Sequence, residues 1–270
     1  MAYTSIFTDV INSYLPEPHA SLLNGIIFGV ALKSDKAFTT ELKHVGLTHL
    51  VVLSGMNITI LSSIISGLTY RLSKKLSILI TLFSIIIFIL FVGIQAPIIR
   101  AGIMGVLTLV ALLTGKKTTV LYTLVVSAVI SLLIWPKWLT SVSFHLSYAA
   151  TLGLIIFAKK VQESESKTIP SKLKYYLKSE FTTTMAAQVF TVPLIFINFK
   201  QISLVAPLSN IAVSWVVSPL MIFGFLTAIL GKIHYSLGLL PSYICYVLLS
   251  YLIFVIHLLS NIPFTFFSLQ

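Results

Sequence analysis

Eight long apolar segments limit what this chain can fold into. A helix needs about 20 apolar residues to cross the hydrocarbon of a bilayer, which is about 30 Å thick. The mean hydropathy of +1.01 and the charged fraction of 9% lie outside the range of soluble globular domains. Because backbone groups must be satisfied within lipid, we predict an all-α, polytopic integral membrane helical bundle with about eight transmembrane helices. The segments lie at residues 46–69, 76–95, 98–115, 118–135, 138–158, 181–199, 204–231 and 238–262.

Residues 1–45 are expected to form interfacial or re-entrant helices rather than a further span. Residues 6–14 place apolar side chains on one helical face and polar ones on the other, as in a helix that lies in the membrane interface or one that packs on the bundle surface. The apolar run at 20–32 is too short to cross and contains the small-residue pair of GIIFG. Asp9 and Glu17 argue against a cleaved signal peptide. Because no linker divides the chain, residues 1–270 are expected to form a single transmembrane domain.

Lysines and arginines predict which loops face the cytoplasm. They gather in alternate loops, which the positive-inside rule places on the cytoplasmic side with both chain ends outside. The hydrophilic segment 159–180 is then a cytoplasmic loop, whereas Lys33, Lys36 and Lys43 lie outside against the rule. The loop cations are Arg71, Lys74, Lys75, Lys116, Lys117, six lysines from Lys159 to Lys178, and Lys232.

Charge and composition exclude several functions. The net charge of +11 does not by itself indicate nucleic-acid binding, because lysines beside anionic lipid account for most of it. No acidic residue lies deep in a predicted span, so a proton or sodium relay has no obvious carrier. The histidines are scattered and Cys245 is the single cysteine. We therefore expect no metal site, no catalytic residue and no cofactor.

The stretch LTHLVVLSGMNITIL, residues 47–61, carries polar residues that a helix facing only lipid would not need. Ser54 and Gly55 permit close helix packing, while His49 and Asn57 are costly in hydrocarbon unless protein or water surrounds them. The same residues are also typical of a broken helix whose freed amides and carbonyls line a polar cavity. Both interpretations remain open from the residues alone.

Arg100 is the single cation inside a predicted span. Its position near the start of the segment allows it to snorkel to the outer headgroups. A guanidinium at the outer mouth of a path would also suit phosphate, which it can bind with two parallel hydrogen bonds.

Three later stretches repeat this polar character within apolar sequence. FHLSYAATLG contains His145 and Ser147, AAQVFTVPLIFINF contains Gln188, and VAPLSNIAVSWVVSPL contains Asn210. Two prolines in the last stretch should kink or interrupt its span. Together with the earlier residues, these helices are expected to surround a hydrated path.

Read in order, these stretches resemble the transmembrane competence domain of the ComEC-type DNA-uptake channel family. HVGLTHLVVLSGMNITIL is similar to the family's His and Ser-Gly signature, IIRAGIMG to its Arg-Ala-x-x-Met helix, and FHLSYAATLG to its Phe-x-Leu-Ser-x-x-Ala-x-x-Gly stretch. Residues 188–220 resemble its Ala-Pro-x-x-Asn block, and residues 14–29 resemble its opening. The sequence departs from the family at Met56 and Asn57, where Leu-His is usual.

The resemblance implies a cytoplasmic-membrane protein that passes single-stranded DNA into the cell during natural transformation. Single-stranded DNA and membrane lipid are then its partners, and an oligomer is compatible with the sequence. No oligonucleotide-binding-like or metallo-β-lactamase-like domain is expected in these residues, so a separate nuclease would degrade the second strand. Since no Gly-rich phosphate loop is present, a cytoplasmic ATP-driven motor is expected to engage the 159–180 loop.

Three other functions stay open. A permease for a small neutral solute fits the lack of intramembrane carboxylates. An intramembrane hydrolase would use Ser54 as nucleophile with His49 or His145 as its base, although the context lacks Gly-x-Ser-Gly. The chain could also be a remnant without transport activity.

Overall fold

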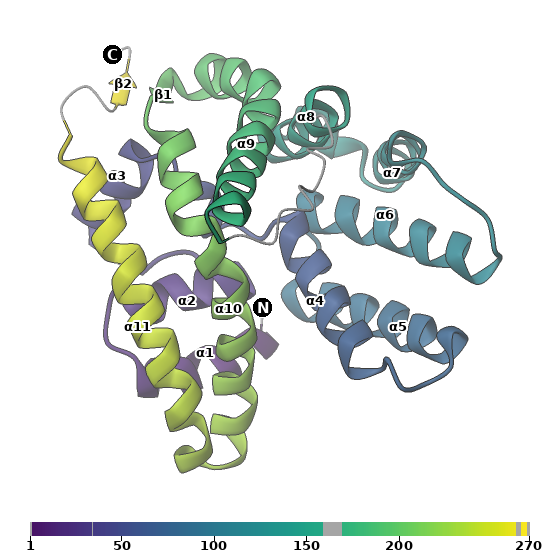
Figure 1. The fold of residues 1–270 in the computed structure, drawn as a ribbon, viewed down its shortest axis with the longest axis horizontal. Helices are drawn as coiled ribbons and strands as arrows, with labels where there is room; N and C mark the ends of the chain where they lie inside the picture. The colour runs from purple at the N-terminus through teal and green to yellow at the C-terminus, as the bar shows by residue number, and fades with distance from the viewer. Residues whose placement is uncertain (1, 34, 159–168, 263–265, 269–270) are drawn as a thin grey trace.

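The structure, a computed structural model, describes residues 2–33, 35–158, 169–262 and 266–268 (Figure 1). These residues are almost entirely helical, as predicted. The α-helices are α1 (Ala2–Tyr14), α2 (His19–Phe28), α3 (Lys36–His44), α4 (Gly55–Leu68), α5 (Lys74–Val92), α6 (Ala96–Leu113), α7 (Val120–Ile134), α8 (Val142–Phe157), α9 (Ile169–Phe199), α10 (Ala206–Ile233) and α11 (Tyr235–Ser260). Two short 3-10 helices, η1 (Thr48–Leu50) and η2 (Pro136–Thr140), and two strands, β1 (Gln201–Ser203) and β2 (Phe266–Ser268), complete the described chain.

Every predicted apolar segment contains a helix, but the helices differ in length. Among the described residues, five helices are long and apolar enough to cross a membrane: α5, α6, α10, α11 and the part of α9 from Tyr175 to Phe199. The helices α4, α7 and α8 have 14, 15 and 16 residues, fewer than a perpendicular span needs. The structure thus supports a multi-pass helical membrane protein, and the count of eight spans stays a prediction.

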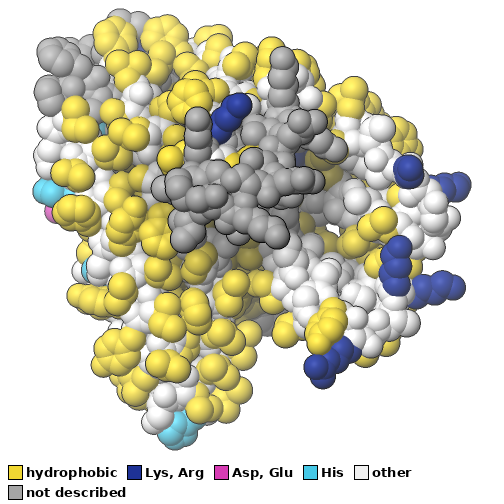
Figure 2. Space-filling view, in the orientation of Figure 1, with side chains coloured by type: hydrophobic (Ala, Val, Ile, Leu, Met, Phe, Trp, Pro, Cys, Tyr) yellow, Lys and Arg dark blue, Asp and Glu magenta, His cyan; other side chains and the backbone are white. Residues whose placement is uncertain are grey.

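The helices form two groups rather than one parallel bundle. Helices α10 and α11 run side by side, with α1 and α2 packed against them (Figure 1). Helices α5 and α6 run across this direction in the same view and contact α4. The loops between α4 and α5 and between α6 and α7 lie at one edge of the second group, where Figure 2 shows a concentration of Lys and Arg side chains. This is the arrangement expected if both loops face the same side of the membrane.

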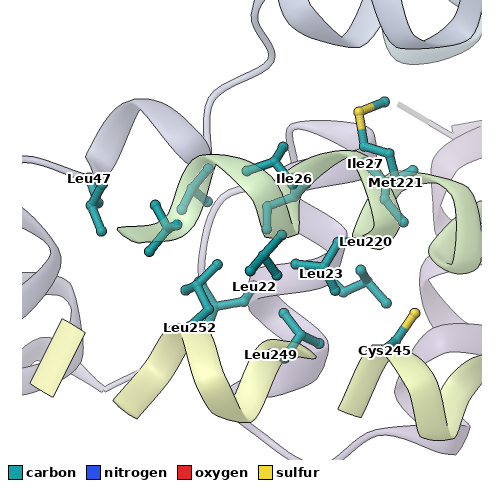
Figure 3. Packing of buried hydrophobic residues seen from close by; sticks show 14 of the residues in the cluster. Leu22, Leu23, Ile26, Ile27, Leu47, Leu220, Met221, Cys245, Leu249 and Leu252 are labelled. Carbon is teal, nitrogen blue, oxygen red and sulfur yellow. The ribbon is translucent and has the colours of Figure 1, made fainter. Parts of the chain in front are cut away.

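Helix α2 forms the centre of the larger hydrophobic core. All of its residues from Ala20 to Phe28 are buried. Figure 3 shows its leucines and isoleucines between Leu220 and Met221 of α10 and Leu249 and Leu252 of α11. A ten-residue helix is too short to span a bilayer, so a position enclosed by protein on every side satisfies its apolar residues. The re-entrant or interfacial placement of residues 20–32 in the membrane stays a prediction.

Gly25, in GIIFG, allows the chain after η1 to approach α2. A Cβ atom at Gly25 would overlap the side chain of Val51. The small residue was expected to permit close packing between helices, and here it permits close packing against the segment that precedes α4.

Two helix boundaries differ from those expected. Helix α9 begins at Ile169, so residues 169–180 of the predicted hydrophilic loop are helical, and residues 159–168 lie outside the described chain. Tyr176 contributes to the difference, because it packs on α10 and its hydroxyl lies 2.9 Å from Ser214 Oγ. Helix α10 continues through Pro219, so the expected interruption does not occur there, and the alternative of a kink at this proline stays a prediction. Buried neighbours such as Val216 and Leu220 hold this part of the helix against α11.

Candidate functional site

The stretch LTHLVVLSGMNITIL contains a broken helix. Residues Thr48–Leu50 form one 3-10 turn, and the α-helix begins only at Gly55. Ser54 is its N-cap: its Oγ accepts a hydrogen bond from the Met56 N–H at 3.2 Å. Asn57 Oδ1 in turn accepts from the Ser54 N–H at 3.0 Å. This reciprocal cap satisfies donors that a helix start leaves unpaired, so the helix begins here, and the polar cavity of the broken-helix interpretation stays a prediction.

Asn57 also anchors α4 to the buried α2. Its Nδ2 donates a hydrogen bond of 2.8 Å to the carbonyl oxygen of Ile26, in the last turn of α2. Carbonyls in the last turn of a helix receive no hydrogen bond from a backbone N–H of that helix. A buried carbonyl without any donor would destabilise the folded state, and Asn57 supplies the donor here. Asn57 is 5% exposed, so its amide is satisfied by protein rather than by water.

His49 does not join this arrangement. Its side chain is exposed, and its Nδ1 lies 3.0 Å from the carbonyl oxygen of Gly46 in the same turn. The turn itself is fixed by Ser209 of α10, whose Oγ donates to the Val45 carbonyl at 2.6 Å. Ser209 was not among the predicted site residues, because a serine next to an asparagine in an apolar stretch has no feature that reveals a partner so far away in the chain.

Arg100 lies where α4, α6 and α8 meet. It is 9% exposed, and its Nε donates to Ser147 Oγ at 2.8 Å. Its Nη1 lies 3.6 Å from Met104 Sδ, and its guanidinium carbon lies 5.9 Å from the ring centre of Tyr148. A Cβ atom at Gly55 would lie 2.9 Å from its Nη2. The Arg100 side chain therefore points into the protein and does not extend along the protein surface toward the lipid headgroups.

The surroundings of Arg100 are neutral. Helices α4, α6 and α8 contain no Asp or Glu. Among the described residues, the single ion pair is His257 with Glu41, 3.3 Å apart and at a distant surface. A buried cation without a carboxylate is costly unless another anion or a polar environment compensates it.

The remaining predicted residues are separate from the Arg100 cluster. His145 of α8, Gln188 of α9 and Asn210 of α10 are half-buried. Their side chains make no hydrogen bond to any part of the chain that the structure describes, and the His145 ring contacts its neighbour Phe144. The structure thus brings Arg100 and Ser147 together at the N-terminus of α4, which Ser54, Gly55 and Asn57 form.

A polar contact between α7 and α8 was missed by the sequence analysis. The Tyr148 hydroxyl lies 3.2 Å from Ser127 Oγ and 3.4 Å from Ser131 Oγ. Both serines are fully buried. Two serines four residues apart on an otherwise apolar helix are the signal that could have found them, because they share one face.

Among the described residues, neither His49 nor His145 forms a hydrogen bond with Ser54. Ser54 Oγ is engaged by Met56 and Asn57, and His49 by Gly46. Within the described ranges, no three His, Cys, Asp or Glu side chains lie close enough together to hold a metal ion.

The sequence of the chain matches a protein family and a known relative. The sequence model of a family described as "Competence protein" matches residues 26–270. Over 198 residues the chain is 24% identical to "ComE operon protein 3" of Bacillus subtilis (strain 168). That alignment covers 72% of this chain and 24% of the relative, so the chain spans about a quarter of that protein's length. No solved structure matches the chain.

Proposed function

Since the chain belongs to the competence protein family, we propose that it forms a channel in the cytoplasmic membrane through which single-stranded DNA enters the cytosol during natural transformation. Family membership and the apolar helices support a multi-pass membrane protein of competence and DNA uptake. The proposal adds three points to this: the channel itself, single-stranded DNA as the transported molecule, and the cytoplasmic membrane as its location.

One observation carries the proposal of a hydrated path. The side-chain amides of Gln188 and Asn210 are half-buried on helices that are candidates to cross the membrane, and the described protein supplies them with no hydrogen bond. An amide that faces hydrocarbon without a partner costs several kcal/mol, on the order of 4 to 8 in a solvent that cannot form hydrogen bonds. Water or a polar solute at these positions removes that cost.

The chemistry of such a path suits transit rather than tight binding. A strand that moves needs phosphate contacts that are few and weak enough to release it. Neutral amides, together with a single buried guanidinium at Arg100, meet that requirement. Aromatic side chains such as Phe190 of α9 and Tyr148 of α8 could stack on bases without sequence preference.

Two partners complete the proposal. Transport against a gradient needs energy, which we assign to a cytoplasmic ATP-driven motor that engages residues 159–180. Degradation of the second strand is assigned to a separate nuclease. Deletion of residues 159–168 is expected to abolish uptake, whereas full uptake without them would contradict the predicted motor contact.

Cysteine accessibility tests the hydrated path. In a Cys245→Ala background, Gln188→Cys and Asn210→Cys are exposed in intact cells to a small, charged methanethiosulfonate. Val189→Cys and Leu208→Cys are matched controls, because each lies beside a test position with its side chain on the exposed face. Thiols in water ionise and react, whereas thiols in hydrocarbon do not.

The proposal predicts fast modification at 188 and 210 and slow modification at both control positions. Addition of the bulky charged group should then reduce DNA uptake. Slow modification at 188 and 210, or equal rates at all four positions, would place these amides against lipid or protein and contradict a hydrated path.

A further inference from the structure

We propose that Arg100 and the N-terminus of α4 form a binding subsite for one phosphate group. The phosphate could belong to a nucleic-acid backbone, a phospholipid headgroup or free phosphate, which share the same tetrahedral anionic chemistry. Assignment to DNA rests on the proposed function, whereas the anion site itself does not.

The first argument is the unused hydrogen-bonding capacity of Arg100. A guanidinium has five N–H donors in a planar fork. The contacts with Ser147 and Met104 use Nε and Nη1, and Nη2 has no hydrogen-bond partner among the described residues. The residue is 9% exposed, and Nη2 is not fully enclosed by protein, so a ligand can reach this unpaired edge of the guanidinium. Phosphate fits such an edge, because its oxygens can accept two parallel hydrogen bonds from a guanidinium.

The second argument is the helix end beside it. Helix α4 has 14 residues, and its dipole places partial positive charge at its N-terminus. The side chain of Ser54 caps the Met56 N–H, while the Gly55 N–H has no partner in the part of the chain that the structure describes. A guanidinium next to this end adds positive charge where the helix already favours an anion.

The two groups lie close because residue 55 is glycine. An added Cβ would lie 2.9 Å from Arg100 Nη2 and 3.3 Å from Ala101 Cβ, both closer than ordinary contact. Any side chain at this position would push the guanidinium away from the helix end. Ser147 holds the other edge of the guanidinium, so its free edge remains beside α4.

Neutral surroundings complete the case for a ligand. No residue of α4, α6 or α8 is acidic, so two positive groups adjoin without a counter-charge from these helices. Such an arrangement is unfavourable when empty and is relieved by one bound anion.

Binding to a labelled single strand tests the subsite. The full chain is purified in a detergent that contains no phosphate, and fluorescence anisotropy measures its affinity for a labelled oligothymidylate across a salt series, with inorganic phosphate as competitor. The variants are Arg100→Gln, Arg100→Lys and Gly55→Ala. Arg71→Gln is the matched control, because Arg71 is an exposed arginine beyond the opposite end of α4.

We expect Arg100→Gln to weaken binding about tenfold or more, the effect of one lost charge-assisted contact. The slope of log affinity against log salt should decrease by about 0.7, as for one phosphate contact to a single strand. Gly55→Ala should weaken binding with the arginine retained, and Arg100→Lys should bind between wild type and Arg100→Gln. Arg71→Gln should bind as wild type does.

Measurement of co-purified phospholipid distinguishes a lipid phosphate from a nucleic-acid phosphate. If the wild-type chain binds no oligonucleotide but retains phosphatidylglycerol on purification, and Arg100→Gln and Gly55→Ala lose it, the subsite is supported as a lipid site and the DNA channel is contradicted. If neither ligand depends on Arg100 and Gly55, or if Arg71→Gln loses as much affinity as Arg100→Gln, the subsite is overturned. Gly55→Ala and Arg100→Lys keep the test decisive should Arg100→Gln fail to fold.

Discussion

Asn57 and Ile26 are 31 residues apart in the chain, and the Asn57 side chain donates a hydrogen bond of 2.8 Å to the Ile26 carbonyl oxygen. This bond joins the start of α4 to the end of the buried α2. It fixes the position of the helix end at which Arg100 lies, so a structural contact in one part of the core determines the geometry of the candidate site.

Replacement of Asn57 tests this anchor. Asn57→Ala leaves the Ile26 carbonyl and the Ser54 N–H without their partner, and a buried group left unpaired costs about 1–3 kcal/mol. We expect the folded chain in detergent to lose about 2 kcal/mol of stability by reversible unfolding. Asn198→Ala is the control, because Asn198 is exposed and bonds within its own helix, and a change within about 0.5 kcal/mol is expected. Equal effects of the two substitutions would contradict the anchor.

Substitution of Ser54 distinguishes a helix-capping role from a nucleophilic role. Ser54→Ala removes the cap of α4 and should lower stability by about 1 kcal/mol. DNA uptake measured at matched membrane levels should remain close to that of wild type. Ser54→Asp, which can also cap a helix, should restore stability. Complete loss of function in both variants with normal stability would instead favour the intramembrane hydrolase.

The close approach of α8 and α9 depends on Gly153. A Cβ atom there would overlap the backbone carbonyl of Ala186, which cannot move as a side chain can. Gly153→Ala should therefore force the two helices apart and cost about 1–3 kcal/mol, the range for overpacked cores. Gly67→Ala is the control, since nothing lies within 4 Å of its added Cβ and alanine is favoured in a helix. Comparison of thermal unfolding for the two variants checks the prediction, and a stable Gly153→Ala would contradict the observed packing.

Hydropathy predicted the positions of most helices, because apolar runs of this length rarely form anything other than membrane-spanning helices. Helices α5, α6, α10 and α11 begin and end near the predicted limits. Helix starts that depend on side-chain hydrogen bonds were predicted less well. The span expected from residue 46 begins as a helix only at Gly55, since Ser54 and Asn57 cap it there. Helix α9 begins within the predicted loop, where Tyr176 packs on α10.

The candidate site could be predicted as a set of polar residues but not as an arrangement. Polarity within apolar sequence identified Arg100, Ser147 and Asn57. Their partners are 47 residues away for Arg100 and 31 for Asn57, and no local pattern encodes such distances. The burial of most of the Arg100 side chain was also unpredicted, because its place near a helix start was equally compatible with a side chain that reaches the headgroups.

DNA uptake in living cells tests the central claim most directly. Cells that lack this chain and any homologue that could replace it receive wild type, Arg100→Gln or Arg71→Gln at matched membrane levels, and entry of labelled, marker-bearing DNA into the cytosol is measured. The account predicts that wild type and Arg71→Gln restore uptake and that Arg100→Gln does not. Uptake that persists without the chain, or that Arg100→Gln restores fully, would contradict a DNA path past the buried guanidinium.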